Sequence, residues 1–209
     1  MRLYYAPGAC SLAPHIVARE AGLSVQLVKV DLAARRTEGG GDYLAINPKG
    51  QVPALKLPDG LVLTEAAVLI QYLADRAPDA GLIPAAGTME RYLVQQWVNF
   101  VATELHKGFG PLWKKETPED MRRIVKETLA TKFAFLDREL AERPFLAGDG
   151  FTVADAYAFT ILGWARFMSI DLARWPNLSV YVERIAARPA VREAMIAEGL
   201  IAADAAQAA

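Results

Sequence analysis

The chain has 209 residues and a mass of 22.8 kDa, a length that suits one medium-sized domain or two small ones. Its 53% hydrophobic and 22% charged residues are typical of a globular protein and exclude an intrinsically disordered one. A formal net charge of −1 argues against a broad nucleic-acid-binding surface. One cysteine excludes an internal disulfide, and one cysteine with two histidines excludes a four-ligand zinc site of the Cys/His type.

The first part of the chain is predicted to alternate strands and helices. Arg2–Ala6 is rich in aromatic and apolar residues and ends before Pro7, which is typical of a strand. Helical spacing of apolar residues predicts a helix over Leu12–Ala21, with Gly22 after its last turn. Alternating apolar residues predict a second strand over Val25–Leu32. A right-handed crossover would make these two strands parallel.

A second group of elements follows a polar, glycine-rich stretch at 35–42. The runs Ala54–Leu57 and Leu61–Leu63 flank a Pro-Asp-Gly turn, which predicts an antiparallel hairpin. Glu65–Arg76 is predicted to be a helix that ends before Pro78. The predicted order is β-α-β-β-β-α, in which a mixed sheet is covered by helices.

Beyond a linker at 79–88 that contains several proline and glycine residues, the pattern is helical throughout. Thr88 is expected to cap a helix that ends at Gly108. Thr117 is expected to cap the next helix and to form a capping box with Asp120; this helix should reach about Glu142.

The helix expected next is apolar on nearly every side. A capping box between Thr152 and Asp155 opens it, and it is predicted to extend over Val153–Phe167. We expect this helix at the centre of the helical half. Two shorter helices are predicted at about 178–187 and 191–198.

No uninterrupted apolar stretch reaches the roughly 20 residues that a membrane-spanning helix requires. The apolar run at the N-terminus is too short for a signal peptide, because Pro7 and Gly8 interrupt it. We therefore expect a cytoplasmic protein with no membrane, nucleic-acid or metal partner.

Cys10 lies between the first predicted strand and the first predicted helix, where Ser11 is placed to cap that helix. A thiol at a helix N-terminus loses its proton more easily, because it lies at the positive end of the helix dipole. The alternative, which position alone favours, is that Cys10 is a small buried apolar residue. No second cysteine follows at C-x-x-C spacing, so a dithiol redox cycle is excluded.

Polar residues at three other places are candidates for a binding site. Glu65 at a helix start could hold a ligand ammonium while neighbouring N–H groups hold a carboxylate, although complementation of the helix dipole is the commoner role of such a residue. Asn99, Thr103 and His106, spaced i, i+4 and i+7, would share one helical stripe about 60° wide. A cis Val52–Pro53 bond would turn the Val52 backbone toward an extended ligand, but the sequence does not show whether it is cis.

Five segments together resemble the bacterial beta-class glutathione S-transferases: LYYAPGACSLAPHI, NPKGQVPAL, LTEAAVLIQYLAD, NFVATELHKGF and FTVADAYAF. NPKGQVP and FTVADAY are typical of the wider superfamily, whereas GACSLAPHI and ATELHKGF are typical of the beta class. The resemblance implies a thioredoxin-like α/β domain (1–78) that binds glutathione, the linker (79–88), and an all-helical domain (89–209) that supplies the electrophile pocket.

The resemblance also implies the residues of a glutathione site. Cys10 would contact the glutathione sulfur and could form a mixed disulfide with it, with Ser11 as an auxiliary hydroxyl and His106 near the thiol. The other implied contacts to glutathione, some from the second subunit of a homodimer, are Arg35, Val52, Pro53, Glu65, Ala66, Asn99, Thr103, Glu104 and Lys107. Phe109 and Trp164 would line the pocket for the electrophile. Arg35 and Ala66 depart from the family, in which lysine and serine are common at these positions.

The resemblance implies an enzyme that conjugates the glutathione thiol to small hydrophobic electrophiles, as in detoxification. Glutathione would be the co-substrate, and no metal would be needed. A glutathione-dependent thiol–disulfide oxidoreductase that acts through a Cys10 mixed disulfide is an alternative. A non-catalytic interaction protein is a second alternative, because a fold does not determine a function.

Overall fold

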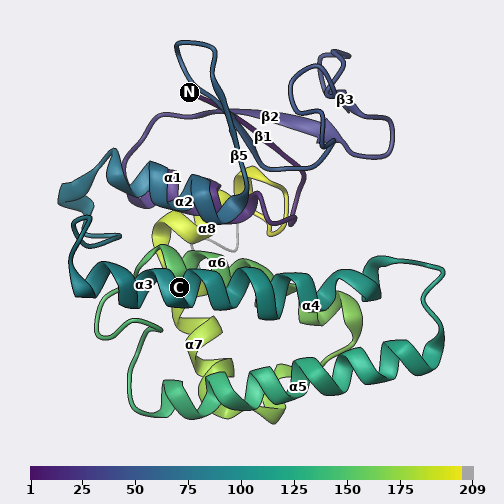
Figure 1. The fold of residues 1–209 in the computed structure, drawn as a ribbon, viewed down its shortest axis with the longest axis vertical. Coiled ribbons are helices and arrows are strands. Elements are labelled where there is room, and N and C mark those ends of the chain that lie inside the picture. The colour runs from purple at the N-terminus through teal and green to yellow at the C-terminus, as the bar shows by residue number, and fades with distance from the viewer. Residues whose placement is uncertain (204–209) are drawn as a thin grey trace. The chain divides into compact units, whose positions relative to one another are not determined.

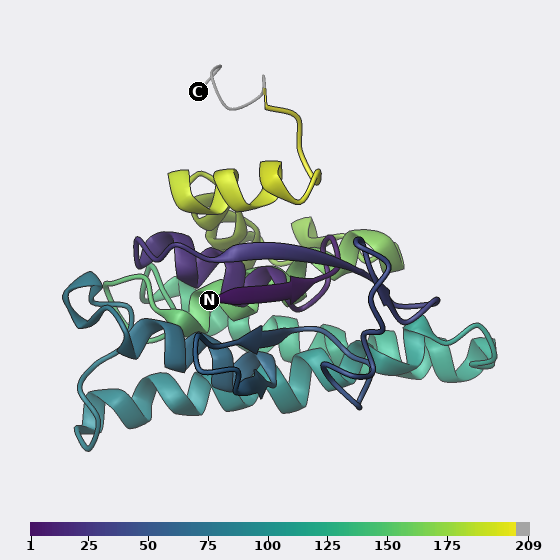
Figure 2. The same cartoon turned by 90° about the horizontal axis from the view of Figure 1, so that it is seen from above.

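The computed structural model describes residues 1–203, and contacts within the chain divide it into two compact units. Unit 1 comprises residues 1–83 and 187–203, and unit 2 comprises residues 84–186. These limits differ from the predicted domain limits, in which the helical domain ran to the end of the chain. The difference arises because α8 (Pro189–Ala197) packs against α1 (Leu12–Glu20), so the two helices lie side by side in unit 1 (Figure 2).

Unit 1 contains a five-stranded sheet with the strand order β3-β2-β1-β4-β5. Its strands are β1 (Arg2–Tyr5), β2 (Gln26–Asp31), β3 (Arg36–Thr37), β4 (Ala54–Lys56) and β5 (Val62–Thr64). β1 is parallel to β2 and antiparallel to β4, and β4 and β5 form an antiparallel hairpin. The predicted parallel pair and the predicted hairpin are therefore confirmed.

The short strand β3 is the one strand of unit 1 that the sequence pattern did not predict. It pairs antiparallel with the end of β2, so that Thr37 lies opposite Val30. Two residues within a glycine-rich stretch show no alternation of apolar side chains, and only the neighbouring strand identifies them as part of the sheet.

Two helices cover one face of this sheet. α1 buries Ile16 and Val17, and α2 (Ala66–Asp75) buries Leu69 and Leu73. Figure 1 shows α1 and α2 on the same side of the strands. This arrangement follows from the helical spacing of their apolar residues, which gives each helix one face suited to burial.

Unit 2 is helical. Its α-helices are α3 (Met89–Phe100), α4 (Lys107–Phe109), α5 (Glu119–Ala141), α6 (Val153–Leu162) and α7 (Pro176–Ala186). Thr88 caps α3 as predicted, because its hydroxyl accepts a hydrogen bond from the Arg91 N–H. Within residues 1–203, no helix combines the length and the apolar character needed to cross a membrane.

The helix after Thr88 departs from the prediction at its C-terminal end. A π-helical turn (Val101–His106) follows α3, and helical turns continue past Gly108 to Trp113. Gly108 does not end the helix. A Cβ atom at this position would lie 3.0 Å from a side-chain carbon of Leu129, so the glycine is explained by the close approach of α5.

Of the two predicted capping boxes in unit 2, one is confirmed and the other is wrong. Thr152 and Asp155 form the reciprocal bonds of a capping box, and all ten residues of α6 are buried, as predicted. α6 ends at Leu162, however, and the chain continues to Met168 as a 3₁₀ helix. Thr117 does not cap α5, because its hydroxyl donates to the Pro111 carbonyl instead, 2.7 Å away.

Candidate functional site

Cys10 and the Val52–Pro53 bond lie together in unit 1. The Cys10 thiol is buried and donates a hydrogen bond to the Val52 carbonyl, with 3.2 Å between Sγ and O. The Val52–Pro53 peptide bond is cis. The loop between β1 and α1 thus meets the chain just before β4, although 42 residues separate the two positions.

Burial raises the pKa of Cys10 to about 12, and the carboxylate of Glu65 adds to this rise. The backbone N–H groups of Cys10 and Ser11 lower the pKa, but their effect is smaller than that of burial. Burial therefore outweighs the effect of the helix N-terminus on the pKa of the Cys10 thiol. At neutral pH the side chain is a thiol, as the alternative of a small buried residue requires.

Ser11 is fully buried and does not cap α1 with its side chain. Its hydroxyl accepts a hydrogen bond from the Ala6 N–H and donates one to the Ala6 carbonyl, each at 3.2 Å. The predicted side-chain cap is wrong because Ser11 already has helical backbone angles, and its hydroxyl closes the preceding loop.

Glu65 precedes α2 at its N-cap position with φ of +72°, rather than occupying the first helical residue. Its side chain is 62% exposed and lies 2.5 Å from the Lys49 ammonium, which also donates to the Thr64 hydroxyl at 3.0 Å. The carboxylate is thus accessible and already pairs with an ammonium group, beside the buried Ala66. Sequence reasoning missed Lys49, although it lies within the quoted segment NPKGQVPAL.

Several side chains hold the segment that leads to the cis bond. Tyr43 and Asn47 both donate to the Gln51 carbonyl at 2.7 Å. The Arg35 guanidinium donates to the Gly50 carbonyl, and Arg35 has a left-handed backbone conformation with φ of +57°. Arg35 thus meets the backbone just before Val52. Tyr43 and Asn47 were not singled out from the sequence, because both bond the backbone carbonyl of Gln51, and such a bond leaves no pattern of residue types.

A buried carboxylate from α8's C-terminal end braces the Cys10 loop. Glu198 accepts hydrogen bonds from the Gly8 N–H at 3.0 Å and from His15 Nδ1 at 2.9 Å. Arg19 donates to the other ring nitrogen of His15 at 3.0 Å. No local sequence signal could have found this network, because 183 residues separate His15 from Glu198.

In unit 2, His106 belongs to an aromatic cluster. Its Nδ1 lies 2.7 Å from the Tyr157 hydroxyl, and its ring meets Trp164 edge to face with 5.0 Å between the ring centroids. Phe109 is fully buried and packs against Trp164 at 5.8 Å, so it supports the Trp164 ring from within the core. Trp113 also packs against Trp164, at 5.4 Å.

The other predicted residues of this segment are exposed or half-buried. Asn99 and Thr103 are exposed, and the Thr103 hydroxyl donates to the Asn99 carbonyl at 3.0 Å. Glu104 pairs with Lys132 at 2.7 Å, and Lys107 is exposed. The predicted stripe assumed α-helical spacing throughout, whereas Thr103 and His106 lie in a π-helical turn, which is wider.

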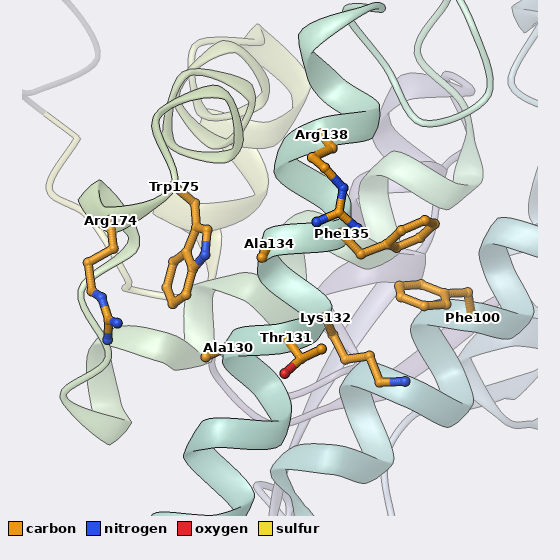
Figure 3. A pocket seen from close by; sticks show the side chains of 9 residues that line it. All are labelled: Phe100, Ala130, Thr131, Lys132, Ala134, Phe135, Arg138, Arg174 and Trp175. Carbon is orange, nitrogen blue, oxygen red and sulfur yellow. The ribbon is translucent and has the colours of Figure 1, made fainter.

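A groove of about 660 Å³ crosses the surface of α5. In Figure 3, Phe100 and Phe135 lie on one side of Ala130 and Ala134, and Trp175 lies on the other. None of the predicted site residues lines this groove, so its size does not make it the candidate site. Within residues 1–203, no group of three or more His, Cys, Asp or Glu side chains is arranged to hold a metal ion.

Comparison with known families identifies both parts of the chain. Residues 8–76 match the glutathione S-transferase N-terminal domain, and residues 100–189 match the glutathione S-transferase C-terminal domain. Glutathione S-transferase GstA of Escherichia coli O157:H7 is 46% identical over 200 residues, which are 96% of this chain and 100% of that protein. The chain therefore belongs to the glutathione S-transferase family.

Solved structures agree with this assignment. A glutathione transferase from Methylococcus capsulatus strain Bath is 53% identical, with a TM-score of 0.94 over 96% of this chain and 99% of that one. A sphingomonad glutathione S-transferase complexed with glutathione is 46% identical, and a beta-class enzyme from Sphingomonas chungbukensis is 45% identical. For both, the TM-score is 0.93, over 96% of this chain and 100% of theirs.

Proposed function

We propose that this protein is a glutathione S-transferase that conjugates the glutathione thiol to small hydrophobic electrophiles. The observation that carries the proposal is the meeting of Cys10 with the cis Val52–Pro53 bond, in a chain of this family. The backbone of Val52, just before β4, suits the extended cysteinyl part of glutathione. Glu65 suits its ammonium group, and the Ala66 N–H at the start of α2 suits its α-carboxylate.

The chemistry requires glutathione sulfur as an anion near neutral pH. The N–H groups of Cys10 and Ser11 lower the pKa of the Cys10 sulfur, and they would act in the same direction on a ligand sulfur beside them. The thiol proton leaves to solvent, and a sulfur lone pair forms the new S–C bond. In a substitution, the leaving group takes the electron pair of the bond that breaks. His106 would supply a further donor, and Trp164 an apolar wall for the electrophile.

Binding and turnover test the proposal. Titration calorimetry should detect glutathione binding at millimolar concentration or below, and an activated aryl halide should be conjugated. Glu65→Gln is expected to weaken binding about 10- to 100-fold, because a charge-assisted hydrogen bond contributes about 1.5–3 kcal/mol. Glu116→Gln, at an exposed position, is the matched control and should bind as the wild type does. Failure of the wild type to bind glutathione would contradict the proposal.

The high pKa of Cys10 bears on the alternative of a thiol–disulfide oxidoreductase. Since the side chain is a neutral thiol below a pKa of about 12, we expect Cys10→Ala to retain conjugation within about threefold. For the same reason, alkylation of Cys10 by iodoacetamide should accelerate as the pH rises toward 12. Loss of conjugation by more than about 100-fold in Cys10→Ala would instead make the thiol a participant.

The proposal also covers the roles of the two domains, the oligomeric state of the protein and its location in the cell. Residues 1–78 would bind glutathione, and the helical domain from residue 89 would supply the electrophile pocket. A homodimer would cover the exposed apolar side chains of Met89, Tyr92 and Leu93 on α3. Light scattering should then report twice the chain mass of 22.8 kDa. A cytoplasmic role in detoxification fits a chain with a single cysteine, and cell fractionation tests the location.

A further inference from the structure

The hydrogen bond between His106 and Tyr157 joins the π-helical turn Val101–His106 to the most buried helix of unit 2. Tyr157 is 2% exposed and lies on α6, all of whose residues are buried. Its hydroxyl lies 2.7 Å from His106 Nδ1, and the two rings are nearly perpendicular, at 88°. The capping box of Thr152 and Asp155 anchors the start of α6, so the hydroxyl is held in place. A fixed group thus meets one ring nitrogen of His106.

The direction of this hydrogen bond follows from the acidity of the two groups. A phenol hydroxyl is a stronger acid than a neutral imidazole N–H, and an imidazole nitrogen is a stronger base than a phenol oxygen. Tyr157 therefore donates its hydrogen to Nδ1, and the hydrogen of the neutral imidazole resides on Nε2.

We propose that Tyr157 is a positioning residue, which orients the His106 ring and holds it as the Nε2–H tautomer. The inference rests on the proposed function, in which His106 Nε2–H donates to the thiolate of bound glutathione. In this arrangement His106 stabilises the anion and does not take the thiol proton, which leaves to solvent. Tyr157 acts through His106 and does not touch glutathione itself.

The other histidine of the chain provides an internal reference. Arg19 can only donate, so His15 accepts its hydrogen bond at Nε2 and carries its own hydrogen on Nδ1, which it donates to Glu198. The two histidines of this protein are therefore expected to hold opposite tautomers. Two sets of imidazole nitrogen signals can be told apart in one spectrum.

The first experiment is nitrogen NMR of the full-length protein labelled at histidine. We expect one imidazole protonated on Nε2, assigned to His106 by its loss in His106→Gln, and one protonated on Nδ1, assigned to His15. In Tyr157→Phe the Nδ1 signal of His106 should shift, because that nitrogen loses its donor. A His106 that carries its hydrogen on Nδ1 in the wild type would overturn the proposal.

The second experiment separates positioning from stability. Tyr157→Phe is expected to lower kcat about five- to tenfold, the effect of one hydrogen bond, while the Kd for glutathione changes less than about threefold. Tyr181→Phe is the matched control: it removes another buried hydroxyl of unit 2, one that bonds Asp155 at 2.9 Å. This control should lower stability while the His106 signals and kcat stay as in the wild type.

The outcomes distinguish this inference from the proposed function. If the wild type neither binds nor conjugates glutathione, the proposed function fails, while the NMR result still decides the tautomer. If the wild type is active and Tyr157→Phe matches it in kcat and in the His106 signals, the positioning role of Tyr157 is refuted.

Discussion

Replacing Asp155 by alanine is expected to destabilise unit 2 by about 3–5 kcal/mol, the usual cost of breaking a buried charged network. The Asp155 carboxylate is fully buried and accepts four hydrogen bonds. Their donors are the Leu146 N–H, the Thr152 N–H and hydroxyl, and the Tyr181 hydroxyl, all within 2.9 Å. Burial raises the pKa of Asp155, and these four bonds oppose that rise by favouring the carboxylate. Alanine would leave the donors without this acceptor.

Thermal unfolding measures this effect. For a chain of about 200 residues, a loss of 1 kcal/mol lowers Tm by about 2–4 °C, so Asp155→Ala should lower Tm by about 6–20 °C. Thr152→Ala is the graded control, because loss of one cap costs about 1 kcal/mol. An Asp155→Ala protein that melts within about 3 °C of the wild type would show that the network adds little.

Replacing Glu198 by alanine is expected to weaken both folding and glutathione binding. Its side chain has no exposed surface, and it accepts hydrogen bonds from Gly8 and His15. Its loss would leave the buried His15 and the part-buried Gly8 N–H without this acceptor, at about 1–3 kcal/mol each, so we expect a total cost of about 2–6 kcal/mol. Gly8 lies two residues before Cys10 in the loop whose N–H groups the proposed site uses. Relaxation of this loop should therefore raise the Kd for glutathione about tenfold.

Glu193→Gln is the matched control for this prediction. Glu193 lies on the same helix and also forms an ion pair, with Arg19 at 2.9 Å, but its side chain is 62% exposed. Exposed pairs contribute about 0–1 kcal/mol, so this variant should unfold and bind almost as the wild type does. Equal effects of the two substitutions, measured by urea unfolding and calorimetry, would contradict a special role for the buried carboxylate.

Much of the fold was predictable because its determinants are local. The hairpin depends on a three-residue turn between two short runs, and the start of α6 depends on two residues three positions apart. Such signals act within a few residues, so the tertiary structure does not need to be known. The resemblance to glutathione S-transferases was equally readable, because its motifs are contiguous stretches of sequence.

The predictions that failed each depended on a competing partner elsewhere. Thr117 had the sequence of a cap but bonds the Pro111 carbonyl, and Ser11 bonds Ala6. Gly108 looked like a helix end, but it makes room for Leu129. In each case the residue type suited the predicted cap or helix end. A residue that folding brings close instead determined the hydrogen bond or the packing at that position.

The sequence by itself determined most of the elements, the parallel and hairpin pairings, the buried central helix and the family. Only the tertiary structure decided that Cys10 is a neutral thiol, that Glu198 braces the loop before it, and that Tyr157 bonds His106. The physical reason is that periodicity and capping depend on residues a few positions apart. Desolvation and buried hydrogen bonds depend on which distant residues pack together, here 51 positions apart for His106 with Tyr157 and 190 for Gly8 with Glu198.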